Sequence, residues 1–402
     1  MTNKNKYLDV IKAYIRALDN EASLSVFWSR HYGKSEKVNW VPDSAIINRN
    51  FHMMISLLSR VYYIVVLSWL LVMPILFIVE YMRWGKKNLK KDKLQCRNIF
   101  LYCSPGSNFN FIDNEAEFYP STGIILPWGR VNKTPEKLSL IDIREISSFQ
   151  VFLISCGLSY LVMLRVIFDP KRIGSVLFTY TALRWFFVRL TLEGNEFRSI
   201  WVTNHYDRWG ISVDGLATYK RIMVQHGSLI DKSHDEFVSY VIQNKLMNKW
   251  ELYLYANDES RIFNECLFGS PPELKVFEIE ISLDKILCCG QKSVLILGDS
   301  RLQDKFIGIS WILQKKYDGN LTILYRPHQR ENIKNLKTEN EELNLIINDD
   351  ERRIPETSVV LSYDSSLDEL LLNTHPANIV RFDTTTNFNE NHIVANIHKA
   401  LG

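Results

Sequence analysis

The 402-residue sequence has almost no excess of charge of either sign. Its 48 lysines and arginines face 45 aspartates and glutamates, which leaves a formal net charge of +3. It also lacks a long basic arm with interleaved aromatic residues, an internal repeat and a low-complexity tract. Proteins that bind nucleic acid usually carry a strongly basic surface. We therefore expect no nucleic-acid partner.

Cysteine patterns are missing as well. Six cysteines occur, but no C-x-x-C pair or zinc-ligand spacing can be built from them. This excludes the disulfide framework of a small secreted protein and indicates reduced thiols in the cytosol. No metal motif is present, so we expect no metal ion and no cofactor. The N-terminal stretch MTNKNKYLDVIKAYIRALDN lacks the apolar core and cleavage site of a signal peptide, so nothing in it indicates secretion.

One long apolar run is present. Residues 61–79 read VYYIVVLSWLLVMPILFIV, without a charged residue. At about 1.5 Å per residue this run nearly covers a hydrocarbon core of roughly 30 Å. Aromatic residues near its ends, such as Trp84, are typical of membrane interfaces. We predict a membrane segment over about residues 61–82, kinked at Pro74. The alternative is a buried helix inside a soluble domain.

Basic residues follow this segment closely. Residues 83–93 read RWGKKNLKKDK, whereas only Arg49 and Arg60 closely precede the segment. By the positive-inside rule the C-terminal side is cytoplasmic. The same cluster would hold the following domain near anionic lipid. Alternatively, a monotopic or re-entrant helix bends at Pro74 and keeps both flanks in the cytoplasm.

A second apolar run, VFLISCGLSYLVML, extends from Val151 to Leu164 and is followed at once by Arg165. It is short for a membrane span. A second crossing would also place the candidate nucleotide site, described below, outside the cytoplasm. We therefore predict a core helix here.

A chain of this length predicts two or three domains. Residues 1–50 mix amphipathic helical spacing with polar loops, and we interpret them as an N-terminal appendage. From residue 97 onward short apolar strands alternate with helical patterns, which predicts parallel sheets with right-handed crossovers. We expect an α/β fold class, with two Rossmann-like units after an N-terminal membrane-associated helical region. The expected limits are 1–94 for the helical region, 95–270 for an acceptor-side domain and 271–402 for a nucleotide-donor-binding domain.

The individual strands are predicted from runs that are apolar on both faces, as strands covered by helices must be. In the first unit they are NIFLYCS, SIWVTN and RIMVQHGS, with helical spacing in HYDRWGISVDGLATY. In the second unit they are SVLILGDS, NLTILYRPH, SVVLSYDSS and NIVRFD, with helices over QDKFIGISWILQKKY and LDELLLN.

Ligands of open parallel sheets bind beyond the carboxyl ends of the strands. One predicted strand ends in Arg326 and His328, a planar cation and an imidazole that both suit phosphate oxygens. Ser365 and Ser366 lie where the next strand becomes a helix, so their hydroxyl and N–H groups would face an anion at a positive helix end. Together these residues predict a donor-phosphate site. The serines also fit a simple N-cap of the helix LDELLLN.

His226 ends a predicted strand and precedes Gly227, which allows a tight turn and close approach of a ligand. From the first unit it would face the donor site and remove a proton from an acceptor hydroxyl. The alternative is a hydrogen-bonded structural histidine. His205, Asp207 and Arg208 form a neighbouring polar cluster, which we interpret either as acceptor-binding or as inter-strand ion pairs.

The motifs VQHGS, YRPHQRE and SYDSSLDELLL, in this order on two α/β units, resemble bacterial inverting glycosyltransferases of the two-Rossmann (GT-B) type that build surface polysaccharides. They look most like the group that joins polysialyltransferase-like enzymes with CDP-glycerol glycerophosphotransferases. The resemblance covers roughly residues 200–385. It implies a base role for His226 and donor-phosphate roles for His328, Ser365 and Ser366, with a donor of the CMP or CDP type.

Two departures from that group stand out. Gln329 occupies a position where the family usually has proline, which alters the strand exit at His328. The acidic-acidic-glycine base motif of the polysialyltransferases is not evident. Asp299, after LILG, is the nearest candidate acid, and we interpret it as a loop residue.

The expectation is an inverting, metal-independent glycosyltransferase that uses a nucleotide-activated sugar and a glycan or lipid-linked acceptor of surface polysaccharide (capsule) synthesis. Its catalytic part would lie on the cytoplasmic side of the cell inner membrane. A CDP-glycerol-type polyol-phosphate transferase shares the same motifs. A non-catalytic membrane scaffold of a polysaccharide assembly complex is favoured by Gln329, and a sugar-nucleotide epimerase would predict a soluble protein. The sequence does not specify the oligomeric state.

Overall fold

A computed structural model describes the chain in two compact units, residues 1–277 (unit 1) and 278–402 (unit 2), which are treated separately below. The residues it describes are 3–31, 62–84, 97–102, 119–126, 138–203, 208–225, 242–254, 260–276, 282–284, 292–298, 302–318, 320–327, 343, 345–347, 353–355, 357–363, 378–381 and 389–402.

Unit 1 is built on a sheet in which all paired strands are parallel. The strands are β1 (Arg97–Tyr102), β2 (Thr122–Ile125), β3 (Ser139–Asp142), β4 (Phe197–Val202), β5 (Thr218–Val224), β6 (Glu251–Leu254) and β7 (Glu273–Val276). Their order is β3-β2-β1-β4-β5-β6-β7, so the chain winds outward in both directions from β1. This is the doubly wound Rossmann order, and its switch point lies between β1 and β4.

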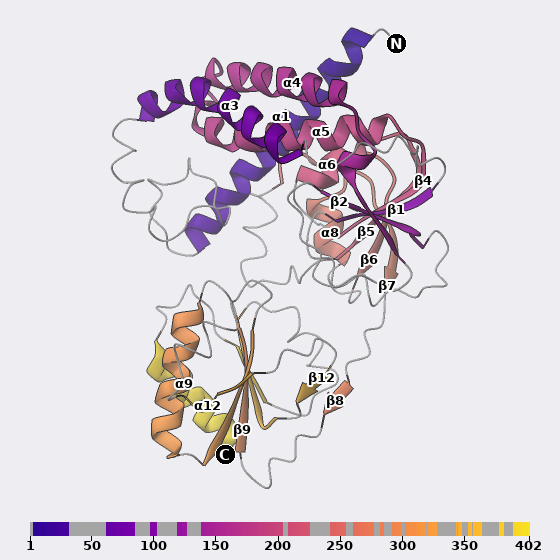
Figure 1. Ribbon diagram of the computed structural model, residues 1–402. Coiled ribbons are helices and arrows are strands. Elements are labelled where there is room, and N and C mark those ends of the chain that lie inside the picture. Colours follow the sequence, from indigo (N-terminus) through magenta and orange to yellow (C-terminus); the bar gives the residue numbers. More distant parts are fainter. Residues whose placement is uncertain are drawn as a thin grey trace. The chain divides into compact units, whose positions relative to one another are not determined.

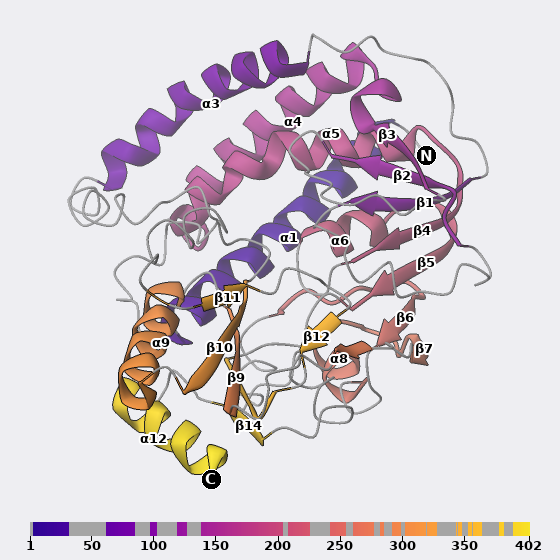
Figure 2. The same ribbon diagram turned by 60° about the horizontal axis from the view of Figure 1, so that its bottom comes forward.

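Helices cover one face of this sheet in layers. They are α1 (Asn3–His31), α3 (Tyr62–Trp84), η4 (Ile143–Glu145), α4 (Phe149–Ile167), η5 (Ile173–Thr181), α5 (Ala182–Glu193), α6 (Arg208–Asp214) and α8 (Ser260–Cys266). Figure 2 shows α4 between α3 on the outside and the helices α1 and α5 nearer the sheet. The α5 helix is buried on almost all sides in the middle of the unit, although it contains Arg184, Arg189 and Glu193.

The α4 helix begins at Ser148, whose hydroxyl accepts a hydrogen bond from the N–H of Val151 at 3.3 Å and so caps the helix. One of its sides is buried against the core, and the buried hydroxyls of Ser155 and Ser159 donate to carbonyls one turn back. The helix predicted over residues 151–164 is therefore present, and one of its sides packs against the core. Its length and composition would also suffice to span a membrane, as would those of α3.

The α1 helix is joined to the body of unit 1 and is not an appendage. Tyr14 is buried, its ring contacts Trp185 edge-on at 5.4 Å, and its hydroxyl lies 3.0 Å from that of Thr181. Polar contacts add to this, since Arg16 donates to the carbonyl of Lys245 at 2.6 Å. The apolar face read from the spacing in residues 1–50 therefore belongs to the core of unit 1, which only the tertiary structure could reveal.

Unit 2 repeats the same winding with fewer strands. These are β9 (Lys292–Leu297), β10 (Leu321–Arg326), β11 (Leu345–Ile347), β13 (Val359–Ser362) and β14 (Asn378–Arg381), in the order β11-β10-β9-β13-β14 and all parallel. The first strand, β9, again lies at the switch point, here beside β13. A separate parallel pair joins β8 (Ser282–Asp284) to β12 (Arg353–Pro355).

Two helices of unit 2, α9 (Gln303–Tyr317) and α12 (Glu390–Leu401), lie together on one side of the sheet (Figure 1). They come close at Gly308, where a Cβ atom would lie 3.2 Å from the carboxylate of Glu390. Asp318 ends α9 in the left-handed conformation, with a φ of 47°. Aspartate tolerates this conformation better than most residues, which explains the sharp turn into β10.

The α/β class with parallel sheets agrees with the sequence prediction. The division between the units follows residue 277, whereas the predicted limit followed residue 270. The cause is β7, a short strand with mostly exposed side chains that pairs with β6 and so belongs to the first sheet. The structure also groups the helical region predicted for residues 1–94 with unit 1.

Candidate functional site

Most residues predicted from the strand ends lie outside the described residues. This applies to the predicted base His226, to the predicted donor-site residues His328, Ser365 and Ser366, to the acceptor candidates His205 and Asp207, and to Gln329 and Asp299. Their predicted roles stay predictions. Arg326 and Arg208 are described, and the strands that lead to the others are described too.

The carboxyl edge of the unit 2 sheet brings two arginines and a serine into one row. Arg326, the last residue of β10, is in register with Leu297 of β9. Ser362, the last residue of β13, is in register with Arg381 of β14. The pairing of β9 with β13 places Ser362 level with Leu297, so the row crosses the switch point. Residues in register on parallel strands present their side chains to the same face of the sheet.

Ser362 is the residue of this row that sequence reasoning missed. Its side chain is fully buried, and its hydroxyl makes no hydrogen bond to any described residue. A buried hydroxyl generally has a hydrogen-bond partner, because leaving it without one costs about 1–3 kcal/mol. The signal in the sequence was its place at the end of VVLS, three residues before Ser365.

The main chain at this edge is held by the strand pairing. The N–H of Gly298, the residue after β9, donates to the carbonyl of Arg326 at 2.8 Å. This bond continues the ladder one step beyond β9 and fixes where β10 ends. The Arg326 side chain is half-buried there. The edge therefore offers a guanidinium and a hydroxyl in register, which are donors suited to phosphate oxygens.

The equivalent edge of unit 1 is aromatic. Tyr102 ends β1 beside the switch point, and its ring contacts Phe100 edge-on at 4.6 Å. Gly123 on β2 makes room for it, since a Cβ atom there would lie 2.7 Å from the Tyr102 ring. The Tyr102 hydroxyl is buried without a hydrogen-bond partner among the described residues, and burial, with a smaller effect of Tyr119, raises its pKa. The group is a neutral donor at this edge.

Arg208, predicted as an acceptor contact or an ion-pair residue, is the first residue of α6. Its guanidinium lies 2.7 Å from Glu21 of α1, and its carbonyl accepts from the indole N–H of Trp185 at 2.9 Å. The observed ion pair thus joins two helices of unit 1. An acceptor contact of Arg208 stays a prediction.

Other charged groups of unit 1 form ion pairs with one another. The carboxylate of Glu251, 1% exposed, contacts Lys220 and lies 2.7 Å from Lys275. Burial opposes ionisation of Glu251, but the two lysines outweigh it and hold the pKa of this carboxyl below its usual range. Because two lysines already pair with this carboxylate, we assign it to the stability of the fold.

Arg189 is the second such group. It is buried in α5 and donates to Glu193 at 2.7 Å, to the carbonyl of Gly215 at 2.6 Å and to the carbonyl of Ser212. These bonds hold the end of α6 against α5. Within the described ranges, no group of three His, Cys, Asp or Glu side chains is close enough together to hold a metal ion.

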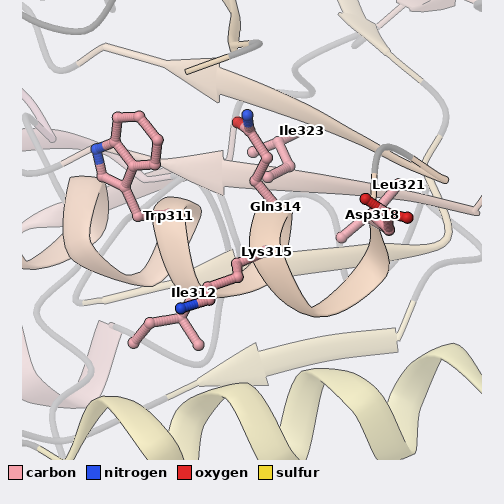
Figure 3. A pocket seen from close by; sticks show the side chains of 7 residues that line it. All are labelled: Trp311, Ile312, Gln314, Lys315, Asp318, Leu321 and Ile323. Atoms are coloured by element: carbon pink, nitrogen blue, oxygen red, sulfur yellow. The ribbon is translucent and has the colours of Figure 1, made fainter. Parts of the chain in front are cut away.

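An open pocket of about 530 Å³ lies elsewhere on unit 2 (Figure 3). It is formed by α9 and the beginning of β10, and its lining residues are Trp311, Ile312, Gln314, Lys315, Asp318, Leu321 and Ile323. Leu321 starts β10, so the pocket lies toward the amino end of that strand, and Arg326 ends the same strand. Ligands of open parallel sheets bind at the other edge. We therefore do not place the functional site here.

No protein-family model matches the sequence, and no curated protein matches it. Among solved structures, the chain is similar to the pneumococcal O-GlcNAc transferase GtfA in complex with UDP and GlcNAc, with 10% identity, a TM-score of 0.33, and 54% of this chain and 52% of that chain covered. A GtfA/B complex gives 11% identity, a TM-score of 0.31, and 54% and 52% coverage. MurG of Acinetobacter baumannii gives 9% identity, a TM-score of 0.35, and 76% and 90% coverage.

The chain thus spans about half the length of the GtfA chains that it matches. The first of these is an O-GlcNAc transferase, but similarities this low do not indicate a shared activity. What can be said of the chain itself is that it contains two doubly wound parallel sheets, the second with a row of phosphate-binding side-chain types at its ligand edge.

Proposed function

We propose that the protein is a metal-independent, inverting glycosyltransferase that takes a nucleotide-activated sugar as donor, of the CMP or CDP type. The observation that carries the proposal is the row of Arg326, Ser362 and Arg381 at the carboxyl edge of a doubly wound sheet, beside its switch point. A ligand with negatively charged oxygens, such as a nucleoside phosphate, suits this edge.

The reaction would proceed by a single displacement. The acceptor hydroxyl oxygen forms a bond to the anomeric carbon of the donor, and the bond from that carbon to the phosphate oxygen breaks. His226 takes the proton of the hydroxyl, and the electron pair leaves with the nucleoside phosphate. Arg326, with His328, Ser365 and Ser366 beyond the described strands, would stabilise the charge that develops on the leaving group. Each well-placed donor commonly contributes a few kcal/mol to such a step.

The proposed acceptor is a glycan or lipid-linked precursor of a surface polysaccharide, handled at the cytoplasmic face of the cell inner membrane. Support comes from the exposed apolar side chains of α3 and from the basic residues that follow it in the sequence. His205, Asp207 and Arg208 are proposed to lie on the acceptor side.

A CDP-glycerol-type polyol-phosphate transferase would use the same edge, with the acceptor oxygen attacking phosphorus instead of carbon. The transferred group separates the two reactions. A sugar transferase moves a sugar without phosphate and releases CMP from a CMP-sugar or CDP from a CDP-sugar, whereas a polyol-phosphate transferase moves glycerol phosphate and releases CMP from CDP-glycerol. A scaffold that binds donor without turnover would bind nucleotide and release neither product.

Nucleotide titration tests the proposal. We expect CMP or CDP to bind purified protein, and Arg326→Ala to weaken that binding about 10- to 100-fold, since a hydrogen bond to a charged group contributes about 1.5–3 kcal/mol. Lys292→Ala is the matched control: this lysine starts β9 at the opposite edge of the same sheet and donates to the carbonyl of Gly402 at 2.5 Å. Isothermal titration with CMP, CDP, UDP and GDP measures both variants. Equal affinity of parent and Arg326→Ala would contradict the proposed donor site.

A further inference from the structure

The α3 helix leaves one apolar side exposed along its whole length. Six large side chains follow one another at intervals of three or four residues and form a single stripe: Ile64, Leu67, Leu71, Ile75, Ile78 and Met82. The most exposed of them, Leu71, is 74% exposed. A stripe of this length on the surface of a water-soluble unit is unusual and marks a contact surface.

The opposite side of α3 contacts unit 1 at several points between Trp69 and Glu80. Near its start the indole N–H of Trp69 donates to the hydroxyl of Thr179 at 3.1 Å. In the middle Met73 is buried. Near its end Glu80 lies 2.6 Å from Arg184 of α5. A helix attached in this way has protein on one side, so lipid cannot surround it.

The α4 helix adds a second stripe beside the first. Phe149, Leu153 and Leu161 are each about half exposed, and Gly157, between them, has no atom within 4 Å of where a Cβ would lie. The Tyr81 ring of α3 lies 5.6 Å from that of Phe149, so the end of α3 meets the beginning of α4. Figure 2 shows the two helices running side by side. The two stripes therefore lie on neighbouring helices of unit 1.

The charges on these helices match an anionic surface. Their sequences contain three charged residues, Glu80, Arg83 and Arg165. Glu80 is paired with Arg184 and lies near Arg83. Arg83 and Arg165 are exposed, one at the end of each helix, and because the helices are antiparallel they flank the apolar face on opposite sides. In the sequence, α3 is followed by five further lysines within residues 85–93.

We propose that α3 and α4 together lie flat in one leaflet of an anionic bilayer, so that the protein is monotopic and α3 does not cross the membrane. Interfacial helices bury their apolar face by about 5–10 Å in this way. Anionic headgroups would meet Arg83 and Arg165. A second copy of the chain fits the face less well, because self-association would bring two exposed basic ends together. The inference rests on the membrane association proposed above, and not on the transfer reaction.

Vesicle sedimentation tests the contact surface. Full-length protein is mixed with vesicles of phosphatidylglycerol and phosphatidylcholine, or of phosphatidylcholine alone. Leu71→Gln with Ile75→Gln removes part of the α3 stripe, and Leu153→Gln with Leu161→Gln removes part of the α4 stripe. Each pair should lower binding to anionic vesicles about tenfold or more, since both remove apolar area from the buried face. Met247→Gln, at a 63% exposed side chain outside both helices, is the control and should bind as the parent.

If the double variant in α4 binds anionic vesicles as strongly as the parent, the proposal that both helices contact the membrane is wrong. Equal binding of the parent to both kinds of vesicle would also contradict it. Sedimentation velocity without lipid tests whether a second copy of the chain binds this face instead. A dimer of the parent that dissociates in both paired variants would assign the face to a second copy and overturn the proposal. Circular dichroism confirms that the variants fold, which their exposed positions favour.

Depth of insertion separates lying flat from crossing. A fluorescent amino acid introduced at position 64, 71 or 78 by amber suppression is quenched by lipids brominated at known depths. Flat insertion predicts the same shallow depth at all three positions. A depth that is greatest at 71 would overturn the monotopic arrangement while keeping membrane association, and no quenching would overturn both. Nucleotide titration in detergent is unaffected by either outcome, so the transfer proposal stands or falls separately.

Discussion

The two sheets of this chain share the doubly wound order, and each carries a buried hydroxyl without a described hydrogen-bond partner at its carboxyl edge, Tyr102 in unit 1 and Ser362 in unit 2. Their neighbours differ. Tyr102 is flanked by aromatic and aliphatic groups, whereas Ser362 is in register with Arg381 and close in the row to Arg326. The same topology thus gives both sheets a carboxyl edge at which a ligand can bind. The side chains at that edge determine whether it suits an anion.

Two charged groups of unit 1 form pairs within that unit. Arg189 and Glu251 are surrounded by partners within their own unit. Paired in this way, they contribute to folding and are not placed for a ligand. Three substitutions test this division between stabilising charges and ligand-binding groups.

Arg189→Met should have the largest effect. It leaves Glu193 and the carbonyls of Gly215 and Ser212 without their buried donor, which costs about 3–5 kcal/mol. Tryptophan fluorescence during urea unfolding reports on unit 1, because Trp311 is the one tryptophan in the sequence of unit 2. We expect the unit 1 transition to move to lower urea concentration.

Arg261→Met is the matched control for that experiment. Arg261 also pairs with a glutamate four residues on, Glu265 at 2.8 Å, but its side chain is 76% exposed. Exposed pairs of this kind contribute about 0.3–0.5 kcal/mol. Equal shifts of the unfolding transition in Arg189→Met and Arg261→Met would show that burial does not determine how strongly these ion pairs stabilise unit 1.

Glu251→Gln should have an intermediate effect, about 1–3 kcal/mol at neutral pH, because charged hydrogen bonds to Lys220 and Lys275 are lost. The pKa of Glu251 in the folded state is lower than its ordinary value of 4.5. The ionised carboxylate therefore stabilises the folded state fully above pH 4.5, and this stabilisation is lost as the pH falls through the lower pKa of the folded state. The unfolding free energy of the parent should therefore fall more steeply below about pH 5 than that of the variant. Parallel pH profiles would contradict the assignment.

Ser362→Ala should have the smallest effect on stability. Removing a hydroxyl that has no partner among the described residues is expected to leave the free energy of unfolding unchanged or to raise it by about 1 kcal/mol. Ser310→Ala, in the same unit, removes a buried hydroxyl that donates to the carbonyl of Phe306 at 2.9 Å and should be mildly destabilising. Nucleotide affinity should fall about tenfold in Ser362→Ala, as the loss of one charge-assisted bond implies, and stay unchanged in Ser310→Ala and Tyr102→Phe.

A loss of nucleotide affinity in Tyr102→Phe equal to that in Ser362→Ala would erase the contrast between the two edges. Titration calorimetry supplies the affinities, and urea unfolding supplies the stabilities. The two readouts are needed together, because a ligand role for Ser362 predicts weaker binding without weaker folding.

Much of the fold could be predicted from the sequence. Seven strands overlap apolar runs that were predicted, namely β1, β4, β5, β9, β10, β13 and β14, and α9 occupies the predicted helix QDKFIGISWILQKKY. These runs are legible because parallel strands covered on both faces must be apolar throughout. The short strands β2, β3, β6, β7 and β11 were not predicted. Three or four residues carry too little periodicity, and β7 is largely exposed.

The candidate site was predicted only in part. Arg326 was identified from its place at the end of an apolar strand, but Ser362 and Arg381 were not. Their relation depends on which strands are neighbours and in what register, and a sequence pattern contains neither. The role of α1 was missed for the same reason, since its partners Thr181 and Lys245 are far along the chain.

The long reach of α1 has a consequence for how the protein is made on the ribosome. Arg16 and Lys245, which bond to each other, are separated by 229 positions. At roughly 5–20 residues per second, translation needs about 10–50 s to make the second partner after the first. During that interval the apolar side of α1, including Tyr14 and Leu18, has no finished core to enter. A nascent chain stalled before residue 245 should therefore expose α1 to chaperones and proteases.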